Sequence, residues 1–322
     1  MRDALLADLS ELPYEIITTI DARVKNDATG HEHSSAGLQA NIHAACRAIE
    51  RDDDVWTIWK DLIAQVDAVL VIAPETDGVL LKFAQLTLSL GKIWLGCGKD
   101  AIEICGNKLK TYEFLRKNNV PVPTFTWQSF CAYEQEYPNT LFAKGNKYVA
   151  KPIDGAGCED TFLFGGFDDL RHFMAPTQIK NRQKSHIIQY FIKGQPASLV
   201  MLCKNGQAHL LCCNRQLIQQ QNKQLLFKGV EINGYAAHWQ VFDNIAKHLA
   251  IWLPSLNGLV GVDIVFDETL ACIIEINPRL TTSYAGLREA IGANPAELII
   301  NTMTDPDFKW PALQQNIVNI HV

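Results

Sequence analysis

The feature that most constrains this chain is a pair of apolar, β-branched runs, 259–266 and 270–276, separated by the polar residues 267–269. Two such runs joined by a short polar segment predict a β-hairpin. Side chains alternate between the two faces of a strand, so Glu275 and Asn277 point the same way. The second run therefore presents a carboxylate and an amide together at the end of an otherwise apolar strand.

Asp263, in the first run, is expected on the same face. With a three-residue loop, Phe266 opposes Leu270. Asp263 then opposes Ile273 and lies one diagonal step from Glu275, at roughly 7–8 Å. A loop of even length would turn Asp263 to the opposite face, because a shift of one residue flips every side chain.

Asp263, Glu275 and Asn277 together predict a site for one or two Mg²⁺ ions, with Mn²⁺ as a substitute, because Mg²⁺ takes carboxylates together with phosphate oxygens. Arg279 follows two residues later, and its forked guanidinium suits phosphate or carboxylate. The competing interpretation is a surface hairpin with ordinary charges. A glutamate between isoleucines is poorly placed for solvent, and a buried carboxylate needs a partner, so the metal site is favoured.

These residues resemble a known superfamily. Asp263 within VGVDIVFD, followed by IIEINPR, is similar to the metal-binding end of the ATP-grasp carboxylate–amine ligases, and the similarity extends over residues 107–288. The continuation NPRLTTSYAGLR resembles one branch, the tyramine–glutamate ligases of methanofuran synthesis and their relatives in methylotrophic bacteria. The resemblance implies an α/β chain with an ATP-grasp fold, in which two α+β subdomains clasp ATP. The expected domains are a short Rossmann-like N-terminal domain, 1–105, and ATP-grasp subdomains over 106–185 and 186–322.

Two lysines and a glycine-containing loop are expected to hold the phosphates of ATP. Lys151 ends a predicted strand and precedes Gly155 and Gly157, a pattern that offers a fixed positive charge and mobile backbone N–H groups to a polyphosphate. Glycine permits close approach and positive φ. Lys108 begins a basic helix over 107–118, and the resemblance implies that it reaches a phosphate; a solvated helix charge is the alternative.

The resemblance implies that the segment HIIQYFIKG holds the adenine of ATP. Gln189 occupies the position whose side chain accepts the exocyclic amine, and an amide oxygen can do so. Backbone contacts are expected from Tyr190, Phe191 and Ile192. Many relatives have a ribose-binding carboxylate farther on, where this chain has Pro196, and Gln195 is a candidate substitute.

The N-terminal third has the pattern of a nucleotide-type α/β domain. Helices are expected over 3–12, 39–58 and 80–90, and strands over 15–20, 67–73 and 92–95. Such a domain normally opens with a strand, so we expect Met1 to be an internal methionine used as a start or the mark of an N-terminal loss. Glu75 follows a strand, where open α/β sheets bind ligands; it is a candidate substrate contact, with a solvated loop acid as the alternative. His31 and His33 are interpreted as solvated loop residues and not as a metal pair.

The remaining elements complete the outline. A hairpin is expected over 197–214 with Asn205-Gly206 in its turn, a helix over 239–252, and a last helix interrupted at Pro295. For Arg215 and Lys228 two interpretations stay open: a side chain that reaches the active site, or a solvated surface charge. The branch resemblance implies substrate contacts from Thr281, Thr282, Ser283 and Tyr284.

Composition narrows the class of protein. The chain has 322 residues, 48% apolar and 20% charged, as globular proteins do. A net charge of −6 gives no basic surface for nucleic acid, and no apolar run is long enough to predict a membrane span. Nine cysteines without a CxxC pair argue against a disulfide framework or a zinc site. We expect a cytoplasmic protein acting on small molecules; the sequence is compatible with a homo-oligomer.

The resemblance implies ATP-dependent amide formation through an acyl phosphate, with Lys151 and Arg279 at the reacting groups. Glutamate is then the carboxyl donor, and tyramine or a related amine is the acceptor. Two alternatives stay open: an ATP-grasp ligase that joins other amino acids or extends a cofactor's glutamate tail, and a nucleotide-binding regulator without turnover.

Overall fold

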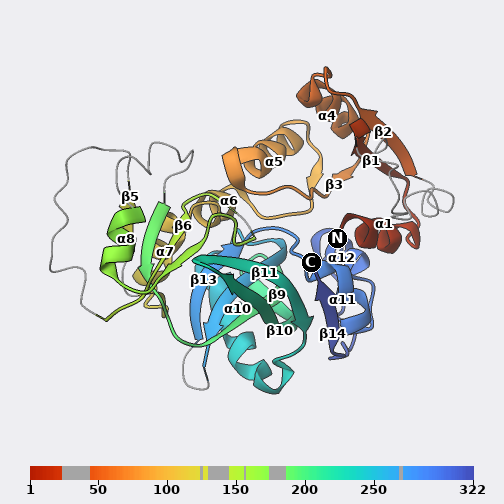
Figure 1. Ribbon diagram of the computed structural model, residues 1–322. Coiled ribbons are helices and arrows are strands. Elements are labelled where there is room, and N and C mark those ends of the chain that lie inside the picture. The colour runs from red at the N-terminus through yellow and green to blue at the C-terminus, as the bar shows by residue number, and fades with distance from the viewer. Residues whose placement is uncertain (24–43, 124–125, 130–144, 156, 174–185, 268–270) are drawn as a thin grey trace.

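The computed structural model describes residues 1–23, 44–123, 126–129, 145–155, 157–173, 186–267 and 271–322 (Figure 1). His31 and His33, interpreted above as solvated loop residues, and residues 268 and 269 of the predicted hairpin loop lie outside these described residues.

The N-terminal third forms two small parallel sheets with helices around them. Its elements are α1 (Arg2–Ser10), β1 (Ile16–Asp21), β2 (Ala44–Ile49), α4 (Val55–Ala64), β3 (Ala68–Val69), the 3₁₀ turn η1 (Thr76–Gly78), α5 (Val79–Ser89), β4 (Ile93–Trp94) and α6 (Lys99–Cys105). β1 pairs in parallel with β2, and β3 pairs in parallel with β4. The Rossmann-like assignment of this part stays a prediction.

One helix prediction in this part is wrong. The described portion of the expected helix over 39–58 begins as strand β2, which pairs with β1 along its whole length, and the helix begins only at Val55. Asp54 caps that helix, since its carboxylate accepts hydrogen bonds from the backbone N–H groups of Trp56 and Thr57 at 3.2 and 3.4 Å. Pairing with a distant strand thus overrides the local helical spacing.

The rest of the chain is built on one large sheet. The strand order is β13-β12-β9-β10-β11-β7-β6-β8-β5, with β14 paired to β11. The strands are β5 (Thr126–Ser129), β6 (Tyr148–Pro152), β7 (Phe162–Phe164), β8 (His186–Tyr190), β9 (Gln195–Lys204), β10 (Gln207–Gln221), β11 (Gln224–Ile232), β12 (Gly258–Phe266), β13 (Ala271–Asn277) and β14 (Val318–His321). The predicted turn between β9 and β10 is confirmed, because Asn205 and Gly206 have φ of +50° and +81°.

Helices cover this sheet on both faces. They are α7 (Lys108–Lys117), α8 (Phe167–Phe173), the 3₁₀ turn η3 (Ala236–His238), α10 (Trp239–Trp252), α11 (Tyr284–Ile291) and α12 (Pro295–Thr304). Figure 1 shows β5 to β8 and α8 at one side of the molecule and α11, α12 and β14 at the other, with the N-terminal elements above. Among the helices that the structure describes, none combines the length and apolar character that crossing a bilayer requires.

Alternation along β9 explains why the sheet has two packed faces. Leu199 and Met201 point to the face on which α10 packs. Val200 and Leu202 point to the other face, where α1, α11 and α12 contribute to a second core. Farther toward the start of β9, Ser198 has the parity of this second face but lines a cavity. The helices therefore cover only part of the second face, and the remainder is open to a ligand.

The register of the β12–β13 hairpin differs from the one expected. Phe266 pairs with Ala271 and not with Leu270, so four residues separate the strands. The expected three-residue loop is therefore wrong, and an even loop alone would turn Asp263 away from Glu275. A β-bulge corrects the parity: Ile264 pairs with Ile273, but Asp263 pairs with Glu275, because Ile274 is an extra residue.

Candidate active site

A cavity of about 600 Å³ lies on the open part of the second face, within the size range of small-molecule sites. Its walls come from the sheet, the segment after β13, the glycine-containing loop after β6 and the end of β8. The sequence-predicted residues that line it are Lys108, Lys151, Gly155, Gly157, Gln189, Tyr190, Phe191, Ile192, Asp263, Glu275, Asn277, Arg279, Thr281, Thr282 and Ser283. Residues from five separate segments of the sequence thus meet in one place.

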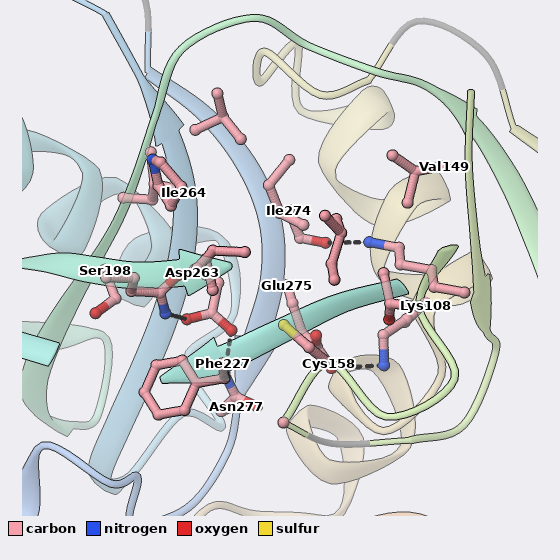
Figure 2. A pocket seen from close by; sticks show the side chains of 18 of the residues that line it. Lys108, Val149, Cys158, Ser198, Phe227, Asp263, Ile264, Ile274, Glu275 and Asn277 are labelled. Carbon is pink, nitrogen blue, oxygen red and sulfur yellow. Dashed lines mark hydrogen bonds and ion pairs between the residues drawn. The ribbon is translucent and has the colours of Figure 1, made fainter. Parts of the chain in front are cut away.

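The floor of the cavity is a row of polar residues that crosses four strands. Glu275 on β13 pairs with Asp263 on β12, Asp263 pairs with Ser198 on β9, and Ser198 pairs with Asn214 on β10. Neighbouring strands lie about 4.8 Å apart. Figure 2 shows Asp263 between Ser198 and Glu275. Two carboxylates therefore stand side by side, with a hydroxyl and an amide continuing the same line.

Asp263 is held from two sides. Gln216 Nε2 donates to Oδ1 at 2.6 Å, and Asn277 Nδ2 donates to Oδ2 at 3.1 Å (Figure 2). Burial, together with the charge of Glu275, raises the pKa of Asp263 to about 6, although these two hydrogen bonds oppose the shift. A cation beside the two carboxylates would relieve this repulsion.

The donor set fits a divalent cation that also binds phosphate. Asp263 and Glu275 supply carboxylate oxygens, the chemistry that Mg²⁺ prefers, and Asn277 lies beside them with its amide nitrogen toward Asp263 and its amide oxygen toward Arg279. Among the described residues, no group of three or more His, Cys, Asp or Glu side chains could hold a metal. The protein therefore offers two carboxylates here, and phosphate oxygens or water would complete the coordination.

Lys108 links Glu275 to the glycine-containing loop. Asn107 caps α7 with its side-chain oxygen, which makes Lys108 the first helical residue and turns it toward the sheet. Lys108 Nζ lies 2.7 Å from Glu275 Oε1 and donates to the backbone oxygen of Gly155 at 2.6 Å. The Lys108 side chain is buried and that of Glu275 is partly buried, 8% and 14% exposed. The alternative of a solvated helix charge is therefore excluded for Lys108.

Lys151 contacts the bulge in β13. It lies near the end of β6, and its Nζ donates to the backbone oxygen of Ile274 at 3.3 Å. Ile274 is the extra residue of the bulge and has no partner in the β12 ladder. Burial lowers the pKa of Lys151 to about 8, against the opposing effect of Glu275. Lys151 is therefore charged at neutral pH and close to its titration point.

Arg279 is fixed by a glutamate of the N-terminal third. Its Nε donates to Glu75 Oε2 at 2.5 Å and its NH2 to Glu75 Oε1 at 3.5 Å; the guanidinium also donates to Asn277 Oδ1 at 3.4 Å and to the backbone oxygen of Leu280 at 3.1 Å. Glu75 is 5% exposed and is not among the residues that line the cavity. The expectation that Glu75 contacts substrate directly is corrected: its carboxylate is occupied by the guanidinium.

Tyr284 requires the same kind of correction. It is buried in the core beneath α1, and its hydroxyl donates to Asp8 Oδ2 at 2.8 Å. Asp8 also accepts from Arg288 NH1 at 3.2 Å, and burial raises the pKa of Asp8 despite both bonds. Tyr284 begins α11 and faces α1, whereas its neighbour Ser283 faces the cavity. The predicted substrate contact at Tyr284 is therefore wrong.

Three residues of the site escaped the sequence analysis: Ser198, Asn214 and Gln216. Asn214 and Gln216 share one face of β10, but the strand is mostly polar from Asn214 onward, so their spacing alone gives no distinct signal. Arg215, between them, points the other way and pairs with Glu231 at 2.7 Å. Lys228 and Gln195 are exposed, and neither is among the cavity-lining residues.

Cys158 also lines the cavity, in the glycine-containing loop, with φ of +63°. Burial raises the pKa of its thiol to about 12, so it stays protonated at neutral pH.

Comparison with known proteins matches residues 105–283 to an ATP-grasp domain and residues 14–102 to a pre ATP-grasp 3 domain. The tyramine–L-glutamate ligase of Methanocaldococcus jannaschii is 30% identical over 267 residues, which cover 81% of this chain and 71% of that protein. The biotin carboxylase of Campylobacter jejuni superposes with a TM-score of 0.72 at 14% identity, over 97% of this chain and 71% of that one. The L-amino acid ligase of Bacillus licheniformis gives 0.65 at 15% identity, over 94% and 71%.

Proposed function

The chain belongs to the ATP-grasp superfamily, has its fold and is an ATP-dependent carboxylate–amine ligase, and we propose that it joins L-glutamate to tyramine or a related amine in the synthesis of a methanofuran-type cofactor. The substrate pair is supported by the 30% identical tyramine–L-glutamate ligase. The observation that carries the chemistry is the Glu275–Asp263 pair at the cavity floor, with two buried lysines at one end and hydroxyl groups at the other.

We propose that ATP occupies the part of the cavity nearest β13. Lys108 and Lys151 would hold its phosphates, and the backbone N–H groups at Gly155 and Gly157 would close over them. The adenine would lie against Gln189 and the backbone of Tyr190, Phe191 and Ile192. This arrangement follows the residues that line the cavity and the family's use of such segments.

Asp263, Glu275 and Asn277 are the proposed holders of Mg²⁺, for which Mn²⁺ could substitute. When bound, the cation would offset the phosphate charge that develops during transfer. Lys108 Nζ lies 2.7 Å from Glu275 Oε1 and pairs with that carboxylate. The same lysine can therefore exchange a carboxylate partner for a phosphate partner as the site fills.

The proposed reaction has two steps. The glutamate carboxylate attacks the γ-phosphorus of ATP; a C–O–P bond forms, the bond to the β-phosphate oxygen breaks, and ADP leaves. The neutral amine then attacks the carbonyl carbon of the acyl phosphate. The C–N bond forms, the C–O bond to phosphorus breaks, inorganic phosphate leaves, and the surplus proton passes to solvent. No protein nucleophile takes part, and the protein contributes positioning and charge.

Arg279 is proposed to hold the anionic oxygens of the acyl phosphate. Glu75, Asn277 and the Leu280 carbonyl occupy most of its N–H groups. The guanidinium is therefore oriented before substrate arrives, so little ordering is needed in the reaction.

The experiment that tests this proposal identifies the product. The protein is incubated with MgATP, tyramine and glutamate carrying ¹⁸O in both carboxyl groups, and products are analysed by mass spectrometry. We expect an amide of glutamate and tyramine, stoichiometric ADP, and one ¹⁸O atom in the released phosphate. A panel of amines and amino acids serves as the control. A different preferred pair would overturn the substrate assignment, and phosphate without ¹⁸O would overturn the acyl phosphate.

A further inference from the structure

The row of polar residues continues past the two carboxylates into a second polar subsite. Ser198 and Ser283 both line the cavity and are 6% and 4% exposed. We propose that their hydroxyl groups bind the carboxylate of the acyl substrate that is not activated, and that Asn214 is the positioning residue that aims both hydroxyls at it. This inference rests on the proposed function, because it assumes a carboxyl substrate with a second anionic group.

The amide of Asn214 fixes the direction of both hydroxyl groups. Its Oδ1 accepts a hydrogen bond from the backbone N–H of Asn233 at 3.2 Å, which settles which amide atom is oxygen. Its Nδ2 donates to Ser198 Oγ at 3.3 Å and to Ser283 Oγ at 3.2 Å. Asn214 is fully buried. Each serine oxygen is thus an acceptor toward Asn214, and its own proton is left to point elsewhere.

The hydroxyl hydrogens of Ser198 and Ser283 can point into the cavity. Each hydroxyl carries one proton to donate, and within the described residues neither serine donates to another protein group. Both side chains reach the cavity, and a donor without a partner at a buried site is costly. Two convergent O–H donors call for acceptor oxygens, and a carboxylate supplies two.

The position of the subsite favours a carboxylate over a phosphate of ATP. Lys108 and Lys151 contact β13, at one end of the polar row, through Glu275 and the Ile274 carbonyl. The two serines lie at the other end, beside β9 and β10, with Asp263 between the two ends. The phosphate-binding lysines are therefore on the far side of the proposed metal ligands. Glutamate carries its two carboxylates on one short chain, so one can rest on the serines while the other reaches the centre of the row.

The segment after β13 builds the wall over this subsite. It runs across the sheet, since Thr281 lies over Gly261 on β12 and Ser283 lies over Asn214 on β10. Ser283 also precedes the first residue of α11, so the positive end of that helix dipole adds to the field there. The subsite is therefore held by strands on one side and a helix start on the other.

The test measures amino-acid binding by titration calorimetry in the presence of MgADP, where no turnover occurs. Ser198→Ala and Ser283→Ala should each weaken glutamate binding by about tenfold, since each removes a hydrogen bond to a charged group. Ser255→Ala is the matched control, because the Ser255 hydroxyl is buried without a hydrogen-bond partner among the described residues. MgADP affinity should be unchanged in all three variants. Glutamate affinities equal to that of the wild type in both cavity variants would overturn the subsite.

Asn214→Asp tests the positioning role without changing shape. A carboxylate accepts from both serines, so their protons turn toward residue 214 and away from the cavity. We expect glutamate affinity to fall at least as far as in the Ser198→Ala/Ser283→Ala double variant, with MgADP affinity close to wild type. Unchanged glutamate affinity in Asn214→Asp would refute the positioning role.

Substrate analogues separate this proposal from the function on which it rests. Glutamine and isoglutamine each replace one carboxylate of glutamate by an amide. The serine variants should lose affinity for glutamate, but not for the analogue in which the carboxylate bound by the serines is the one replaced. If the wild type prefers another amino acid from a full panel, glutamate is not the carboxyl substrate. The serine variants are then compared with the wild type in their affinity for that preferred amino acid, and equal affinities overturn the subsite. If the wild type binds no amino acid, the subsite itself is overturned, whatever the product analysis gives.

Discussion

Asp263 and Glu275 lie directly opposite each other on β12 and β13, although four residues separate the two strands. The even loop would place them on opposite faces, and the bulge at Ile274 returns them to one face. The same bulge frees the Ile274 carbonyl from the β12 ladder, and Lys151 donates to it. One inserted residue thus sets both the carboxylate pair and the lysine beside it.

Removing Glu75 should destabilise the protein and impair the site together. Glu75→Ala leaves the Arg279 guanidinium, 14% exposed, without its partner, and breaking a buried pair in this way costs about 3–5 kcal/mol of unfolding free energy. Glu75→Gln keeps an acceptor and should lose less. Denaturant unfolding measures the cost, with Asp169→Ala as the control because its pair with Lys223 is half exposed on both sides. A Glu75→Ala stability equal to that of the control would show that the pair is not needed.

A methyl group at Gly261 should disrupt the substrate wall, and a second substitution should restore it. A Cβ on Gly261 would lie 2.4 Å from Thr281 Cγ2 but 3.5 Å from the remaining Thr281 side-chain atoms. Gly261→Ala should therefore raise the KM of the carboxyl substrate several-fold while leaving the KM of ATP nearly unchanged. Thr281→Ser removes only the clashing methyl, so the Gly261→Ala/Thr281→Ser double variant should recover most of the loss. Absence of recovery would mean that the contact does not shape the site.

Nucleotide binding should be strongest between about pH 6 and pH 8. Burial raises the pKa of Asp263 to about 6, so below that pH the carboxyl gains a proton and attracts a cation less. Burial lowers the pKa of Lys151 to about 8, so above that pH the amine loses the charge that attracts phosphate. MgADP affinity measured across pH should fall on both sides. In Lys151→Arg the alkaline fall should disappear, because a guanidinium stays charged; an alkaline limb that persists in that variant would assign it to another group.

Local patterns predicted the parts of this fold that depend on neighbours in sequence. The helix over 239–252 is confirmed at both ends by α10, where apolar side chains repeat at helical spacing. Lys151 before a glycine-containing loop and Glu275 two residues before Asn277 lie at the cavity as their motifs indicated. These features are predictable because each depends on only a few residues that are adjacent in sequence.

The parts that failed depend on distant partners. β2 was mistaken for helix because its pairing with β1 is not visible in its own residues. β14 was missed because a four-residue strand forms only against β11. The bulge at Ile274 could not be read from the hairpin alone, since a shorter loop with no bulge would satisfy the same pattern. Asn214 gained its place in the site only when β10 paired with β9.

The most direct test of the account is the position of a divalent cation in a crystal of the protein grown with Mn²⁺ and a non-hydrolysable ATP analogue. Anomalous scattering at the manganese edge locates the ion independently of the rest of the density. We predict a peak in contact with the carboxylates of both Asp263 and Glu275, with phosphate oxygens completing the coordination and Lys108 moved from Glu275 to a phosphate. A nucleotide bound with its cation elsewhere, or with Lys108 still paired to Glu275 and no peak between the two carboxylates, would contradict it.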